Sequence, residues 1–208
     1  MRKRIFPFFA ILVFSVFSVS AFVSADDMKN ELGNKVMDFT LEDVTTGKEH
    51  SLHKMLSKDG VNGAVLVFMS KNCPVSNACD ERYVKLAEEL KRDGILFVGI
   101  NSNTTENVDE ISESAKKMNY NFPVLKDWNN VIADQFDAQF TPHAYLISKE
   151  GVLLYKGRID DNHRKPENVK ERTLSNVVNE YSRGEDLSYN ETKSVGCTIK
   201  RVKKYDSN

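Results

Sequence analysis

The sequence has little of what marks the special structural classes. It contains 10 glycines and 5 prolines among 208 residues, and 28% of its residues are charged. This composition excludes a collagen and fits neither a disordered chain nor a multispan membrane protein. The formal net charge of −1 leaves no excess of basic residues, whereas sequence-independent nucleic-acid binding needs a basic surface. We therefore expect a globular protein that does not bind nucleic acid.

Several chemical signatures are also missing. There is no glycine-rich phosphate loop, no zinc-ligand spacing and no hydrolase triad motif, so we predict no cofactor and no resident metal. Cysteine is scarce, with three residues in the whole chain. An odd number cannot be paired completely within one chain, so at least one thiol is left to explain.

Long hydrophobic runs are absent except at the N-terminus. Residues 1–4 are mostly basic, residues 5–23 carry no charge, and small residues follow at 23–25. This pattern is typical of a secretory signal peptide over residues 1–25. The alternative is an uncleaved membrane anchor, because the apolar run approaches the roughly 20 residues that span a bilayer. We expect export to the periplasm or the extracellular space.

Removal of residues 1–25 leaves 183 residues, and the loss of three basic side chains changes the net charge from −1 to −4. No linker divides the remainder. We predict one domain over residues 26–185, followed by a polar C-terminal tail over residues 186–208 that carries Cys197.

Two apolar runs predict the centre of a β-sheet. Residues 64–69 and 95–100 are short, continuous and rich in β-branched side chains, as expected of strands buried on both faces. A helical pattern over 74–91 connects them, so the two strands should be parallel with a right-handed crossover. Residues 144–147 and 152–155 are joined by a tight turn at 149–151 and predict an antiparallel hairpin.

The remaining patterns complete an α/β chain. We expect a short N-terminal hairpin over 39–52, a short extended segment over 122–125, and further helices over 108–118, 131–136 and 168–181. The predicted fold is a central mixed β-sheet flanked by helices, with an N-terminal hairpin and a C-terminal tail.

Cys73 precedes Pro74 at the junction between a buried strand and a helix. Proline is favoured in the first turn of a helix, where its missing N–H costs nothing. Cys73 should therefore lie beside the unpaired N–H groups and the positive end of the helix dipole, both of which favour a thiolate. A thiolate is the nucleophile in disulfide exchange and in peroxide reduction.

Several segments carry a resemblance to a known family. They are the strand-Cys73-Pro74-helix unit, Thr141-Pro142 before a hairpin, the opening 38–48, the segment 157–161 and the tail 195–200. Together they resemble the thioredoxin superfamily, and within it the redoxin group of the AhpC/TSA type, which includes peroxiredoxins. The resemblance extends over roughly residues 36–200 and implies a thioredoxin-like fold.

The resemblance also implies roles for single residues. Cys73 would be the attacking nucleophile, and Pro142 would be cis, leaving backbone groups of Thr141 free to pair with an extended substrate. Ser70 matches the hydroxyl that holds peroxide in peroxiredoxins. The remaining candidates for contact with a substrate are Pro74, His143 and Arg158, of which Arg158 would supply a guanidinium near the thiolate.

The chain departs from both catalytic patterns of the family. Ser76 stands where a dithiol thioredoxin has its second cysteine, and Asn72 stands in place of the usual tryptophan. A resolving thiol must therefore come from Cys79 or Cys197. Bridging Cys73 to Cys79 requires the first helical turns to unwind, because six helical residues rise by about 9 Å. The alternative is a static Cys79–Cys197 disulfide that holds the tail and leaves Cys73 free.

We interpret the sequence as an exported thiol redox protein that acts by thiolate attack of Cys73 on a disulfide or a peroxide. Its partners would be such a substrate and an unidentified reductant, and a membrane only if the signal segment is retained. The alternative is a non-catalytic thioredoxin-like binding module with structural cysteines, or a copper metallochaperone that uses Cys73, Cys79 and His143.

Overall fold

A computed structural model describes residues 29–203, so the predicted signal peptide lies outside the described residues. The main sheet has seven strands in the order β2-β1-β5-β4-β3-β7-β8. Its strands are β1 Thr40–Asp43, β2 Glu49–Ser51, β3 Gly63–Phe68, β4 Ile95–Asn101, β5 Val124–Lys126, β7 His143–Ser148 and β8 Leu153–Gly157. The helices are α1 Leu52–Leu56, α2 Pro74–Asn77, α3 Asp80–Arg92, α4 Val108–Lys117, α5 Val131–Gln135 and α6 Thr173–Ser182, with short 3₁₀ turns η2 Trp128–Asn130 and η3 Pro166–Asn168.

The two apolar runs form the centre of the sheet, as predicted. Every residue of β3 is buried, and β3 pairs in parallel with β4 from Gly63 opposite Ile95 to Phe68 opposite Ile100. The hairpin of β7 and β8 is antiparallel, and β7 adds to the other edge of β3. The mixed α/β prediction is therefore confirmed, with β3 as the most enclosed strand.

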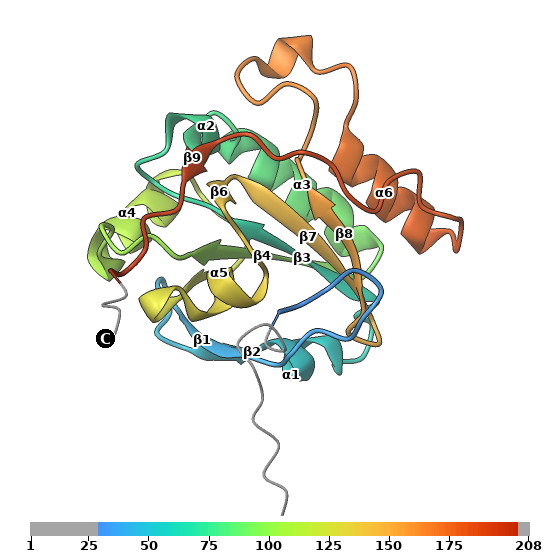
Figure 1. Ribbon diagram of the computed structural model, residues 1–208, viewed down its shortest axis with the longest axis horizontal. Helices are drawn as coiled ribbons and strands as arrows, with labels where there is room; N and C mark the ends of the chain where they lie inside the picture. The colour runs from blue at the N-terminus through green and yellow to red at the C-terminus, as the bar shows by residue number, and fades with distance from the viewer. Residues whose placement is uncertain (1–28, 204–208) are drawn as a thin grey trace, which may run out of the picture.

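Helices cover both faces of the sheet (Figure 1). Alternate side chains of β3 point to opposite faces, so Val65 and Val67 join one core while Leu66 and Phe68 join the other. The first core is closed by side chains of α3, α4 and α6, and the second by side chains of α1 and α5. Two separate apolar layers thus fix the sheet between the helices.

Two predicted helices differ from the structure in ways that matter for the site. The helix expected over 74–91 is interrupted, because the Cys79 N–H bonds Ser76 three residues back at 2.9 Å and α3 begins anew at Asp80. The helix expected from residue 168 begins at Thr173, after the 3₁₀ turn η3 and an extended residue, Val169. The five-residue helix α1 was not predicted at all, since it is too short to show a helical period.

The C-terminal tail folds back onto the domain. Its strand β9, Cys197–Thr198, pairs antiparallel with β6, Phe140–Thr141, as a separate two-stranded sheet. In Figure 1 the red tail crosses above β6 and runs beside α2. The tail thereby reaches the end of the sheet at which β3 leads into α2.

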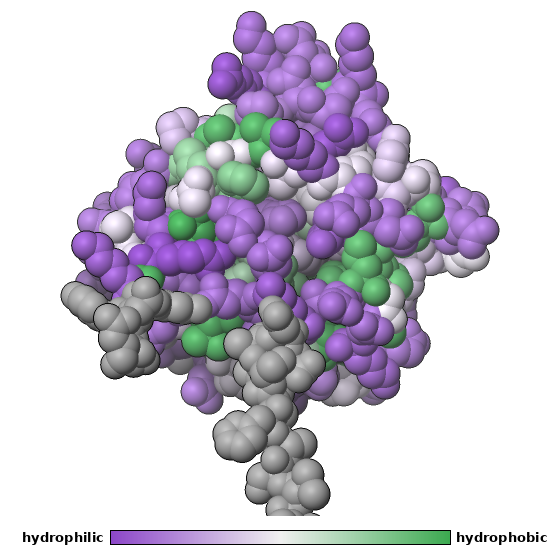
Figure 2. Space-filling view, viewed as in Figure 1, coloured by the Kyte–Doolittle hydropathy of each residue, from purple (hydrophilic) through white to green (hydrophobic). Residues whose placement is uncertain are grey.

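The surface shows no broad apolar area on the face in view. Figure 2 shows a mostly hydrophilic face with separate hydrophobic patches, which is the normal pattern for a globular protein. Between residues 29 and 203, no helix is both long enough and apolar enough to cross a bilayer.

Candidate active site

Cys73 caps the N-terminus of α2. Its backbone is extended, with φ −94° and ψ 113°, and its sulfur accepts a hydrogen bond from the Ser76 N–H at 3.4 Å. Pro74 occupies the first turn of the helix, where no N–H is needed. The prediction that Cys73 lies at a helix N-terminus is confirmed, although the helix is only one turn long.

The Thr141–Pro142 peptide bond is cis, as the resemblance implied. The Cys73 thiol donates to the Thr141 carbonyl oxygen at 3.1 Å, so the loop before β7 lies directly against the cysteine. The Thr141 backbone, however, is not left free for a substrate. Cys197 of β9 is its partner in the β6–β9 ladder, which corrects the expectation of an open pairing edge.

Cys197 lies beside Cys73. Cys197 pairs with Thr141 across the β6–β9 ladder, and the Cys73 thiol contacts the carbonyl of the same Thr141, so the two thiols are close enough to shift each other's pKa. Burial acts to raise the pKa of Cys73, but hydrogen bonds from the Cys197 and Thr141 side chains and from the Ser76 and Cys197 backbone hold its pKa below the ordinary value. Burial and the hydrogen bond with Cys73 raise the pKa of Cys197. Cys73 is therefore the more acidic thiol of the pair.

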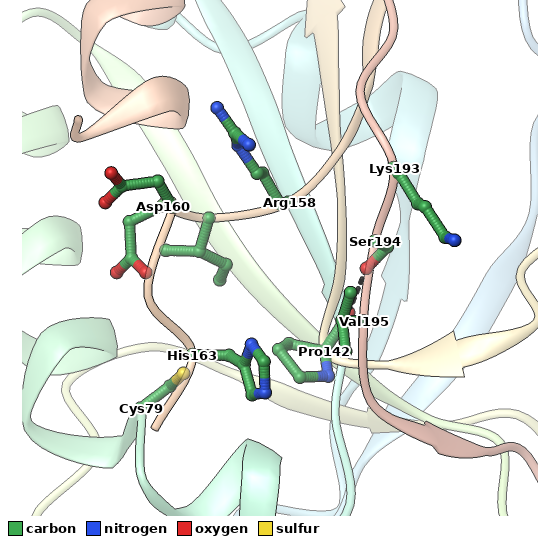
Figure 3. A pocket seen from close by; sticks show the side chains of 10 residues that line it. Cys79, Pro142, Arg158, Asp160, His163, Lys193, Ser194 and Val195 are labelled. Carbon is green, nitrogen blue, oxygen red and sulfur yellow. Dashed lines mark hydrogen bonds between the residues drawn. The ribbon is translucent and has the colours of Figure 1, made fainter. Parts of the chain in front are cut away.

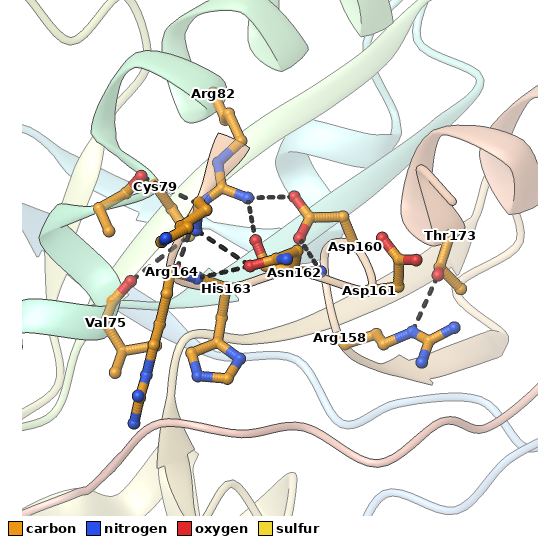
Figure 4. Close-up of polar contacts among 12 residues, drawn as sticks. Val75, Cys79, Arg82, Arg158, Asp160, Asp161, Asn162, His163, Arg164 and Thr173 are labelled. Carbon is orange, nitrogen blue, oxygen red and sulfur yellow. Dashed lines mark hydrogen bonds and ion pairs between the residues drawn. The ribbon is translucent and has the colours of Figure 1, made fainter. Parts of the chain in front are cut away.

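Cys79 is set apart from this pair. Its thiol donates to the Val75 carbonyl at 3.4 Å and accepts from the Arg82 guanidinium at 3.1 Å (Figure 4). Burial raises the pKa of Cys79 to about 11 despite the nearby positive charge. All three cysteines are free thiols in the structure. The arrangement brings Cys197 to Cys73 and leaves Cys79 as a packed, protonated side chain.

The two serine candidates are tied to other groups. Ser76 is fully buried, and its hydroxyl contacts the Tyr83 hydroxyl at 3.2 Å and accepts from the Ser70 N–H at 3.2 Å. The Ser70 hydroxyl donates to a carboxylate oxygen of Glu106 at 2.5 Å. Both serines therefore brace the segment before Cys73, and the Ser70 hydroxyl is committed to the carboxylate.

Glu106 is a site residue that the sequence patterns did not indicate. It is 3% exposed and accepts from the Ser70 hydroxyl, from the backbone N–H groups of Lys71 and Asn72 at 3.2 and 3.1 Å, and from Asn101 at 2.5 Å. It lies in the loop between β4 and α4, 33 residues after Cys73 in the sequence. One buried carboxylate thus holds the loop that presents the cysteine.

Arg158 and His143 make their contacts away from the Cys73 sulfur. Arg158 donates to the Thr173 hydroxyl at 2.9 Å and forms an ion pair with Glu171 at 2.8 Å. The His143 Nδ1 lies 2.9 Å from the hydroxyl of Tyr145 on the same strand. Burial and the nearby Lys156 lower the pKa of His143 to about 4, so the ring is neutral at neutral pH. The Arg158 guanidinium is thus paired within the β8–α6 connection, while Arg158 also lines the cavity beside Pro142, and its role in contact with a substrate stays a prediction.

A small cavity of about 80 Å³ opens beside Pro142 (Figure 3). Its wall includes Cys79, Asp160, His163 and the tail residues Ser194 and Val195. The Asp160 side of the cavity is organised by Arg82, which pairs with that carboxylate and donates to the Asn162 carbonyl at 3.0 Å (Figure 4).

In the described part of the chain, no three histidine, cysteine or acidic side chains gather as metal ligands. Within residues 29–203, Cys73, Cys79 and His143, the three residues of the copper alternative, therefore do not form such a group.

Comparison with known proteins identifies a family model and relatives that this chain resembles. The sequence model of the AhpC/TSA family matches residues 32–156. The thiol–disulfide oxidoreductase ResA of Bacillus subtilis (strain 168) is 27% identical over 125 residues, which cover 59% of this chain and 64% of that protein. The chain therefore matches less than two thirds of this relative's length.

Solved structures support the same fold. An uncharacterised conserved protein from Geobacillus kaustophilus is 26% identical, with a TM-score of 0.76 over 84% of this chain and 94% of that one. A putative thioredoxin from Neisseria meningitidis, 20% identical, gives a TM-score of 0.52 over 61% of this chain and 79% of that one. The fold is thioredoxin-like, as predicted.

Proposed function

The chain belongs to the AhpC/TSA family, and on that premise we propose that it is a thiol–disulfide oxidoreductase in which Cys73 attacks and Cys197 resolves. The observation that carries the proposal is the position of Cys197, which pairs with Thr141 in the β6–β9 ladder while the Cys73 thiol donates to the Thr141 carbonyl at 3.1 Å. Because a thiolate is the nucleophile in disulfide exchange, the group with the lowered pKa takes the attacking role. Cys73 has that lowered pKa.

The reaction balances with the two thiols. The Cys73 thiolate attacks one sulfur of a substrate disulfide, which forms a mixed disulfide and releases the other substrate sulfur as a thiolate. Cys197 then loses its proton and attacks the Cys73 sulfur. This step forms a Cys73–Cys197 disulfide and releases the second substrate thiolate. The substrate gains two electrons and the protein loses two, which an external dithiol must return.

Disulfide exchange is favoured over peroxide reduction by two side chains. The Ser70 hydroxyl donates to Glu106, and the Arg158 guanidinium binds Glu171 and Thr173. Neither group is therefore aimed at an oxygen atom bound next to the Cys73 sulfur. Peroxide remains the competing substrate class in the test below.

The test compares three single variants, Cys73→Ala, Cys197→Ala and Cys79→Ala, with oxidised glutathione and with hydrogen peroxide as oxidants. We expect Cys73→Ala to consume neither oxidant. Cys197→Ala should stop at a glutathione adduct on Cys73, and Cys79→Ala should behave like the unmodified protein. Mass mapping of the oxidised protein should find a Cys73–Cys197 bond. A Cys79–Cys197 bond, or faster consumption of peroxide than of glutathione disulfide, would contradict the proposal.

Export is part of the proposal. The basic residues 1–4, the uncharged run 5–23 and the small residues at 23–25 support it. The N-terminal sequence of the protein recovered from its native compartment is the direct measurement. A chain that begins at Asp26 is the expected result, and a full-length chain in the cytoplasm would contradict it.

A further inference from the structure

The tail occupies the edge at which an extended polypeptide would bind. An extended peptide joins a protein by adding a strand to an exposed sheet edge, where its backbone pairs with the edge strand. Next to Cys73 that edge is β6, and β9 already pairs with it, Thr198 opposite Phe140 and Cys197 opposite Thr141. A second strand has no free backbone groups to pair with on this side.

The segment 194–200, which we call the tail strand, is held on both sides of Cys197. Before it, the Ser194 hydroxyl donates to the Pro142 carbonyl at 2.5 Å. After it, the Ile199 N–H donates to Gln139 at 3.0 Å, and the Ile199 side chain, 3% exposed, enters the core. Displacing the tail strand therefore means breaking several contacts together.

Lys200 adds a third attachment. Its N–H donates to the Asn103 side chain at 2.8 Å, and its carbonyl accepts from the Thr104 N–H at 3.0 Å. These bonds fasten the end of the tail strand to the loop that also supplies Glu106. The tail strand is therefore connected to the same loop that positions Cys73.

Gly196 makes the close approach of the tail strand possible. A Cβ atom at this position would overlap the carbonyl oxygen and carbon of Thr141 and approach the Pro142 nitrogen within 3.1 Å. Backbone atoms cannot rotate out of the way, so only glycine fits where the tail strand crosses the loop before β7. The sequence at this point is therefore suited to covering the site.

The consequence is a difference in access. Cys73 is 1% exposed beneath the tail, whereas Cys197 is partly exposed. The cavity beside Pro142, about 80 Å³, is bordered by Ser194 and Val195. Cys73 is not among the residues that line this cavity, so a disulfide reaches its sulfur only when the chain around Cys197 moves. A small molecule needs only local movement around Cys197, but a polypeptide needs the whole tail strand to leave.

We propose that the tail strand makes the Cys73–Cys197 pair selective for small-molecule disulfides and excludes polypeptide disulfides until the tail strand is displaced. This inference rests on the proposed function, because it uses the same attack by Cys73. The chemistry is the exchange already described, with a small disulfide as the acceptor of two electrons.

The test weakens the tail strand without touching the thiols. Gly196→Ala places a methyl group against Thr141, and Thr198→Ala is the matched control because Thr198 is an exposed residue of the same strand. Reduced proteins are mixed with excess insulin or with excess oxidised glutathione. The loss of the free Cys73 thiol is followed by acid quench, alkylation and peptide mass mapping.

The insulin rate should be proportional to the fraction of molecules in which the tail strand is displaced, whereas the glutathione rate should not depend on that fraction. If Gly196→Ala increases the fraction about tenfold, the ratio of the insulin rate to the glutathione rate should rise about tenfold. Thr198→Ala should leave the ratio within about twofold of the unmodified protein, since its side chain points away from the site. Ser194→Ala, which only removes the bond to Pro142, gives a second variant if Gly196→Ala does not fold. It should show a smaller rise.

Two results would overturn the inference alone. One is an insulin-to-glutathione ratio that is equal in the unmodified protein and in the weakened variants. The other is glutathione consumption by every variant together with no reaction of insulin in any of them. If neither probe reacts with any form of the protein, the proposed function itself is wrong, and the inference is overturned with it.

Discussion

Replacing Glu106 by glutamine tests whether one buried carboxylate positions the cysteine loop. One oxygen of Glu106 accepts from the Ser70 hydroxyl and the Asn72 N–H, and the other accepts from the Lys71 N–H and Asn101. A glutamine amide keeps one acceptor oxygen and puts an NH₂ donor in place of the other. Donors would then face donors on one side of the group.

The neighbouring hydrogen bonds also determine which carboxylate oxygen of Glu106 the glutamine NH₂ group would replace. Asn101 cannot turn its amide, because its oxygen accepts from the Lys126 ammonium at 3.1 Å and from the Asn103 N–H at 3.2 Å. The Ser70 hydroxyl can rotate and accept, so the new NH₂ group should face Ser70. The Asn72 N–H then keeps only its 3.3 Å contact with the Ser70 oxygen.

The substitution therefore removes one charge-assisted bond and weakens the others. Bonds to charged groups contribute about 1.5–3 kcal/mol each, so we expect a loss of about 3 kcal/mol in the free energy of unfolding. For a domain of this size that corresponds to a fall of roughly 6–12 °C in Tm.

Urea unfolding and thermal melting measure the change directly. Glu110→Gln is the matched control, because Glu110 carries the same carboxylate four residues later but is 48% exposed and pairs with Lys71 at 3.3 Å. A surface pair of this kind contributes about 0.2–1 kcal/mol, so the control should melt within a few degrees of the unmodified protein. Equal melting temperatures for the two variants would refute the reasoning.

Three further predictions concern titration and access. The pH midpoint for alkylation of Cys73 should lie below the roughly 8.5 of a free cysteine. Cys197→Ala should move this midpoint upward, because the substitution removes a side chain that lowers the pKa of Cys73. An unchanged midpoint would show that the Cys197 side chain has no effect on that pKa. Cys79, whose pKa burial raises to about 11, should be alkylated at pH 8 only at the rate of unfolding, as measured in a urea series; rapid labelling in native buffer would contradict this. Burial lowers the pKa of His143 from 6.5 to about 4, so between these pH values the unfolded chain binds more protons than the folded one, and the free energy of unfolding should fall as the pH drops from about 6.5 to 4. His143→Gln should flatten this part of the plot of unfolding free energy against pH, measured by urea unfolding. An identical slope in both proteins would contradict the lowered pKa of His143.

The sequence indicated the local features of the site correctly. Continuous apolar runs identify β3 and β4 because strands buried on both faces leave no room for polar side chains. Cys73 before Pro74 indicates a helix N-terminus because both residues suit that one position. These features depend on neighbours in the chain, so a periodic pattern or a dipeptide is enough to reveal them.

The contacts that the sequence did not indicate depend on residues distant in sequence. Resemblance alone implied a role for Arg158, and the structure adds that Glu171 and Thr173 bind it. Glu106 gave no signal, because a single acid in a loop is usually solvated. Its importance comes from four donors brought to it by folding. Contacts of this kind cannot be read from spacing.

The three cysteines show most clearly what the sequence determines and what only the tertiary structure determines. By itself the sequence indicated which thiol would have a lowered pKa, because the groups that favour the Cys73 thiolate include the N–H groups of its own helix. The partner thiol was decided by tertiary structure. Cys79 is six residues away but is enclosed against Arg82, while Cys197 is 124 residues away and is brought to Cys73 by pairing between β6 and β9. Proximity in the fold is set by strand pairing and by the space that Gly196 leaves beside Thr141, and neither depends on distance along the chain.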